Sequence, residues 1–179
     1  MKKLMAGLLM LGSVGVFLGT AQAAPTADLI LTVTPNGTKS LTLSTGTLAL
    51  GTLNLASVDN ISSSVTVTNN GTVSENLGLR IKTADGVWSS GGSAGADTYN
   101  LRALFNSAAP AAGDFAANDD VLTQGSPELA TGIGAVYSGD QNGAVFDAAT
   151  TRGLWFKIDM PTTSTIATQR SFTVEVSAN

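Results

Sequence analysis

The 179-residue chain contains no histidine and no cysteine, and only 12% of its residues are charged. These absences remove the commonest general base, the commonest metal ligand, the thiolate nucleophile and every disulfide. Nine Lys and Arg residues against 13 Asp and Glu residues give a formal net charge of −4, so we expect no nucleic-acid partner. Because 43% of the residues are hydrophobic, the chain is also unlike a disordered acidic tail.

Residues 1–23 have the three parts of a secretory signal. Two lysines follow the initial methionine, residues 4–18 are apolar apart from small residues, and the Ala-Gln-Ala motif at 21–23 has the form of a cleavage site. A retained membrane anchor is the competing interpretation, but glycines and hydroxyl residues interrupt the apolar stretch. We therefore expect a cleaved signal peptide, a single domain at 24–179 with no membrane span, and a secreted product. The product would be extracellular or at the cell surface, with the periplasm as an alternative, and folding without disulfides favours a prokaryotic source.

Apolar and polar residues alternate with a period of two over much of the remaining chain. Such a period places apolar side chains on one face of a β-strand and hydroxyl groups on the other. The clearest runs are 28–33, 40–44, 64–68, 77–82, 153–160 and 171–177. No comparable stretch has a sustained helical period. The sequence therefore predicts an all-β protein, an antiparallel β-sandwich of immunoglobulin-like or Greek-key type with about eight or nine strands.

Turn signals and small-residue stretches separate these runs. Asn69-Asn70-Gly71 predicts a hairpin between its two flanking runs. Four leucines between 48 and 55 change parity at Gly51-Thr52, which indicates a strand with a bulge or tight bend. Residues 84–97 and 107–120 are rich in Gly, Ser or Ala and are predicted as long loops, which are either functional or tolerated insertions.

Two segments resemble exported prokaryotic immunoglobulin-like modules. Residues 65–75, VTVTNNGTVSE, are similar to the strand–turn–strand unit of such modules, and residues 170–176, RSFTVEV, to their last strand. These modules serve as stalks, adhesion units or cell-surface structural repeats. The resemblance therefore implies a non-enzymatic role at the cell surface.

The residues present form no recognisable catalytic set. No histidine can activate a serine, and no Ser-x-x-Lys pair replaces it. Two carboxylates alone could serve a glycosidase. The candidates are Asp119, Asp120, Glu128 and Asp140, all in predicted loops, where solvated carboxylates are the simpler interpretation. We predict that the protein is not an enzyme.

Calcium is the one metal for which the sequence offers ligands. Asp140, Asn142 and Asp147 place hard oxygen ligands on either side of Gly143, as calcium loops do. The third acidic or amide position and the terminal Glu of a full calcium loop are missing. An ordinary Asn-Gly turn explains the same residues, so the calcium site and the plain turn both stay open. No other cofactor is expected.

Two tryptophans are candidate contacts for a partner. In the run 153–160, alternation places Trp155 on the polar face beside Lys157 and Asp159, where a ring could contact a partner. The competing interpretation is that a long loop covers it. Trp88 lies in the first long loop, where it either covers one end of the sandwich or stacks on a sugar.

These observations predict a secreted structural or assembly protein of the cell exterior, as a surface, filament or matrix subunit. Residues 24–34 form a short lead into an alternating strand, which could self-associate by pairing with the open sheet edge of a neighbouring subunit. The alternative is an extracellular binding module for a glycan or a surface protein. Such a module would use aromatic residues drawn from Trp88, Trp155, Tyr99 and Tyr137.

Overall fold

The computed structural model describes residues 30–116, 120–130, 136–166 and 168–179. The chain divides into two units, residues 1–35 and residues 36–179. In the first unit, residues 30–35 form no strand and their side chains are exposed. The predicted strand at 28–33 is therefore wrong for residues 30–33, because alternation alone makes no strand where the backbone has no partner to bond. The predicted signal peptide lies outside the described residues. In the part of the chain that the structure describes, no helix has the length and apolar character needed to cross a bilayer.

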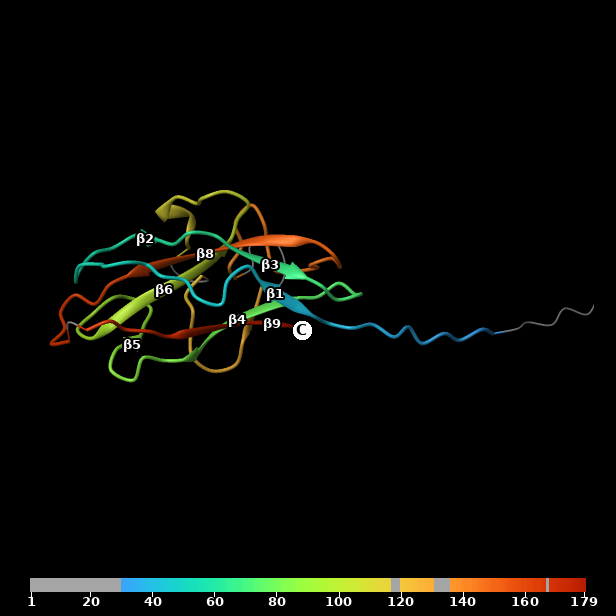
Figure 1. The fold of residues 1–179 in the computed structure, drawn as a ribbon, viewed down its shortest axis with the longest axis horizontal. Helices are drawn as coiled ribbons and strands as arrows, with labels where there is room; N and C mark the ends of the chain where they lie inside the picture. The colour runs from blue at the N-terminus through green and yellow to red at the C-terminus, as the bar shows by residue number, and fades with distance from the viewer. Residues whose placement is uncertain (1–29, 117–119, 131–135, 167) are drawn as a thin grey trace, which may run out of the picture. The chain divides into compact units, whose positions relative to one another are not determined.

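The described part of the second unit contains nine strands and one short 3-10 helix (Figure 1). The elements are β1 (Leu41–Leu43), β2 (Asn60–Ile61), β3 (Val65–Asn69), β4 (Leu77–Thr83), β5 (Ser89–Ser90), β6 (Thr98–Phe105), η1 (Ala112–Asp114), β7 (Glu128–Leu129), β8 (Thr151–Asp159) and β9 (Thr173–Ala178). The alternating runs that begin at residues 40, 64, 77, 153 and 171 all became strands, which confirms this part of the prediction.

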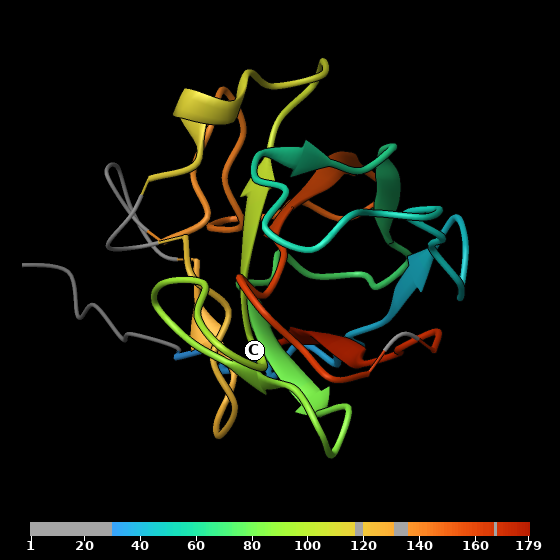
Figure 2. The same cartoon turned by 90° about the vertical axis from the view of Figure 1, so that its left-hand side faces the viewer.

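The strands form two sheets. The larger sheet has the order β1-β3-β8-β6-β5, with β2 also paired to β8, and the smaller sheet has the order β7-β4-β9. All strand pairs are antiparallel except β5 with β6. In Figure 2, β4 in green and β9 in dark red lie together beneath the strands of the larger sheet. The structure thus confirms an antiparallel β-sandwich.

The core lies between the two sheets and draws on both of them. The apolar residues of the alternating runs supply it, as in β3, where Val65 and Val67 are 4% and 0% exposed. The buried cluster includes Leu77, Leu79 and Ile81 from the smaller sheet and Leu101, Phe105, Leu154, Phe156 and Ile158 from the larger sheet. Alternation therefore predicted these faces because one side of each strand packs on the other sheet.

The hairpin predicted at Asn69-Asn70-Gly71 is wrong. The strand before it, β3, pairs with β1 and β8, whereas the strand after it, β4, pairs with β7 and β9. Asn69 is fully buried, and its side-chain amide donates to the carbonyls of Val73 and Phe146, at 3.0 and 2.8 Å. These bonds hold a connection that passes from one sheet to the other, so the two strands never meet as a hairpin.

Two further differences concern strands that alternation does not identify. No alternation predicts β6, because this strand lies inside the larger sheet and has buried residues on both faces. The predicted strand at 48–55 is wrong, since no strand is assigned there. Its leucines Leu48, Leu50 and Leu53 pack partly buried against the core, and Gly51 has a φ of 75°, which supplies the predicted bend.

Candidate functional site

The connection after β6 covers the outer face of β8. Trp155 is partly buried there, and its indole Nε1 donates to the carbonyl of Asn106 at 2.9 Å. Two residues further on, Lys157 is only 5% exposed, and its ammonium lies 5.9 Å from the centre of the Phe115 ring. The face that alternation predicted to be outward is thus largely covered, which agrees with the interpretation that a long loop packs over Trp155.

Lys157 is a buried cation with two oxygen partners. Its ammonium donates to Asp59 Oδ1 at 2.8 Å and to the carbonyl of Ala112 at 3.2 Å. The Asp59 side chain is half exposed, so one end of this ion pair is solvated while the other end is not. Because Lys157 bonds both to Asp59, just before β2, and to the carbonyl of Ala112 in η1, its ammonium ties the covering loop to the sheet rather than offering a charged surface to a partner.

Trp88 belongs to the core cluster and is 7% exposed. Its indole Nε1 donates to Ser164 Oγ at 2.9 Å, and its backbone N–H donates to Asp85 Oδ2 at 2.8 Å. Asp85 also pairs with Arg170 at 2.7 Å. This arrangement agrees with the interpretation in which the Trp88 ring closes part of the sandwich.

Burial and hydrogen bonding shift the pKa values of two groups near Trp88 in opposite directions. Burial alone would raise the pKa of Asp85, but the hydrogen bonds from Arg170 and from the Trp88 N–H outweigh it, so this pKa lies below its ordinary value. Burial, together with the nearby Asp85 charge, raises the pKa of Tyr99 to about 12. The Tyr99 phenol therefore stays neutral in the physiological range.

The three residues of the predicted calcium site each bond to a different segment. Asp140 accepts from the backbone N–H of Ser107 at 2.7 Å and from the Ser107 hydroxyl. Asn142 Oδ1 accepts from the N–H of Ala144 at 3.0 Å, as in an Asn-Gly turn, and Asp147 accepts from the hydroxyl of Ser74 at 2.7 Å. Among the described residues there is no cluster of three or more acidic side chains that could hold a metal ion.

The four carboxylates considered for glycoside hydrolysis do not form a common site among the described residues. Asp140 and Asp120 accept hydrogen bonds from different loop segments. Asp120 is 2% exposed and accepts from the N–H groups of Tyr137 and Ala116, at 2.8 and 2.6 Å. These bonds fix two loop segments to each other. Glu128 is exposed on β7, and Asp119 lies outside the described residues.

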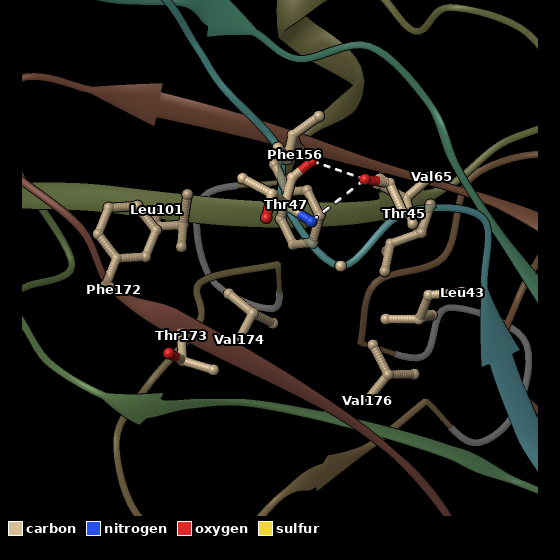
Figure 3. Close-up of a pocket in the computed structure, with 13 residues that line it drawn as sticks. Leu43, Thr45, Thr47, Val65, Leu101, Phe156, Phe172, Thr173, Val174 and Val176 are labelled. Carbon is tan, nitrogen blue, oxygen red and sulfur yellow. Dashed lines mark hydrogen bonds between the residues drawn. The ribbon is translucent and has the colours of Figure 1, made fainter.

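An apolar groove lies between β1, at one edge of the larger sheet, and β9, at one edge of the smaller sheet. Residues from β1, β3, β6, β8 and β9, together with residues 45–48 after β1 and Phe172 before β9, line one space of about 190 Å³ (Figure 3). They include Leu43, Val65, Leu101, Phe156, Phe172, Val174 and Val176. Every residue that lines the groove is apolar, glycine or threonine, so the groove offers hydrophobic contact without charge.

The two strands that flank this groove are edge strands of their sheets. Among the described residues β1 pairs only with β3, and β9 pairs only with β4. The apolar side chains Phe172, Val174 and Val176 face the core and yet are only partly buried. An open sheet edge is part of the sequence-based hypothesis, but this groove is not, because its lining comes from segments far apart in the chain.

The chain was compared with protein-family models, with curated proteins and with solved structures, and none of the three comparisons gave a match.

Proposed function

We propose that the protein is an exported, non-enzymatic structural subunit that assembles with copies of itself at the cell exterior. One observation carries the proposal. Ile30, Leu31 and Val33 stand 85%, 77% and 82% exposed in a segment whose alternation is that of a half-buried strand. A soluble chain gains by covering such a segment, and an extended peptide is most readily covered by adding to an exposed sheet edge.

Two further features support self-association over other roles. Both sheets of the sandwich end in edge strands, β1 and β9, beside an apolar groove. The leader pattern at 1–23 favours export, and the absence of histidine and cysteine from the sequence favours a structural role over a catalytic one. The resemblance of residues 65–75 and 170–176 to immunoglobulin-like surface modules points the same way.

The alternative, a binding module for a glycan or a surface protein, has less support from the aromatic residues. Tyr99 and Tyr137 are 0% exposed and Trp88 is 7% exposed, while Trp155 is partly exposed. Of these four rings, Trp155 is the one that could contact a sugar without a rearrangement of the loops. Binding on a glycan array that a Trp155→Ala variant loses while remaining folded would favour this alternative.

The proposal is tested by the association state of the exported chain. We expect concentration-dependent polymers that persist in high salt, because the contacts would be apolar and backbone-mediated rather than ionic. A variant with Ile30, Leu31 and Val33 all changed to Ser should stay monomeric with an unchanged circular-dichroism spectrum. A wild-type chain that sediments as a monomer at every concentration would contradict the proposal.

A further inference from the structure

We propose that the groove between β1 and β9 receives residues 30–34 of a second copy of this chain, paired as an added strand along the free edge of β9. This inference rests on the proposed function and names the surface and the segment that would carry it. Three independent properties of the chain support it: the lining of the groove, the backbone of β9 and the pattern of the exposed segment.

Several apolar side chains at the groove are only partly covered in the single chain. Val174 and Val176 of β9 and Phe172 just before it pack against the core, but they remain only partly buried. On the other side of the groove, Leu43 of β1 is 41% exposed. An apolar strand placed between β1 and β9 would cover both sets of side chains at once.

Among the described residues, the backbone of β9 has no bonding partner on the side of the groove. Asn76 and Asn179 exchange both of their backbone hydrogen bonds, at 3.1 and 2.9 Å. In antiparallel pairing such exchange recurs at every second residue, and the pairs in between direct their N–H and C=O groups away from the partner strand. Val174 and Val176, opposite Ile81 and Leu79, are pairs of that second kind. They therefore present backbone groups to an incoming strand.

The exposed segment fits this edge in length and pattern. Residues 30–34, ILTVT, carry no charge, like the residues that line the groove. Five residues span about 13 Å from first to last Cα in a strand, which equals the span from Val174 to Ala178. With a period of two, Leu31 and Val33 would face the groove while Ile30 would face outward.

A second copy is the occupant that the exposures favour. The single chain leaves Leu31 and Val33 77% and 82% exposed and leaves the groove residues partly exposed as well. Each copy thus has one donor segment and one acceptor groove. If the donor segment of each copy binds the groove of the next copy, the subunits form an open filament. A heterologous contact of this kind continues indefinitely unless it closes into a ring.

The test uses two matched substitutions in the exported chain. Leu31→Asp places a charge in the apolar groove and should weaken association at least about 100-fold. Ile30→Asp makes the same chemical change one residue earlier on the outward face and should change association by less than about threefold. Amide hydrogen exchange then reports the acceptor side. The N–H groups of Val174 and Val176 should be protected in the assembly and should exchange fast in the Leu31→Asp protein.

A synthetic peptide of residues 29–35 provides an independent readout if assembly is difficult to handle. Added to the Leu31→Asp protein, it should restore protection at Val174 and Val176, whereas a peptide with the same Leu31→Asp change should not.

The outcomes separate this inference from the proposed function. A wild-type chain that never associates overturns both. If the chain still associates after Leu31→Asp, the inference is overturned and the proposed function stands. The same holds if Ile30→Asp and Leu31→Asp weaken association equally. Protection of Val174 and Val176 in a monomer, independent of concentration, means that the chain fills its own groove and also overturns the inference.

Discussion

Replacing Gly153 with alanine tests the close packing between β8 and the loop that covers it. A Cβ atom at Gly153 would lie 2.4 Å from the backbone oxygen of Asn106. That oxygen accepts the indole hydrogen bond of Trp155, at 2.9 Å, and the Asn106 N–H donates to the Gly153 carbonyl, at 2.8 Å. The atom in the way belongs to the backbone, so the loop itself must move to admit a methyl group.

The expected cost of Gly153→Ala follows from these contacts. Inserting a methyl group into a closely packed site costs about 1–3 kcal/mol. Weakening the two hydrogen bonds of Asn106 adds about 1 kcal/mol, since each bond contributes about that much on its own. We therefore expect the free energy of unfolding to fall by about 2–4 kcal/mol and Tm to fall by about 5–15 °C. Urea titration and thermal melting followed by circular dichroism measure both quantities.

Gly92→Ala is the matched control. A Cβ atom at Gly92 would meet nothing within 4 Å, so this variant should stay within about 0.5 kcal/mol of the wild type. The fluorescence of Trp155 should change in the Gly153 variant, because its indole partner moves, and not in the control. Equal stability of the two variants would refute the packing of the loop on β8.

The remaining predictions concern the core, pH and calcium. Leu101→Ala removes a side chain that is 1% exposed and should lower the free energy of unfolding by about 2–5 kcal/mol. Leu31→Ala should change the free energy of unfolding of the dissociated chain by less than about 0.5 kcal/mol. Urea titration of both variants measures the difference. Because the pKa of Asp85 is lowered in the folded protein, its pairing with Arg170 stabilises the fold above about pH 4, and this stability is lost as the pH falls through the lowered pKa. Asp85→Asn should therefore be less stable at neutral pH and should show a weaker loss of Tm on acidification; equal acid sensitivity of the two proteins would contradict this. Calcium chloride should leave Tm unchanged relative to EDTA, because both Asp140 oxygens already accept hydrogen bonds from Ser107; a rise in Tm that Asp140→Asn abolishes would instead establish the calcium site.

The sequence predicts those strands that have one buried face and one solvent-exposed face. In β3 and β4 an apolar residue stands at every second position because one face packs on the opposite sheet. The strand β6 escapes this rule, since residues on both of its faces are buried. A half-polar run such as TYNLRALF then has no period from which to predict a strand.

The environment of the candidate site depends on contacts between distant segments. Alternation placed Trp155 and Lys157 on the outer face of β8 correctly, but it could not show that Phe115 and Ala112 would fold over them. The groove was equally hidden, because Leu43 and Val176 are far apart in the chain and meet only through the order of the strands. The exposure of residues 30–33 could not be anticipated either, because their alternation predicts a half-buried strand, whereas the structure shows exposed side chains and no strand there.

The central claim, that the exported chain is a self-assembling subunit, is tested most directly by electron microscopy of the purified protein over a range of concentrations. Our account predicts filaments whose number grows with concentration and which survive high salt. Isolated particles of single-chain size at all concentrations would contradict it.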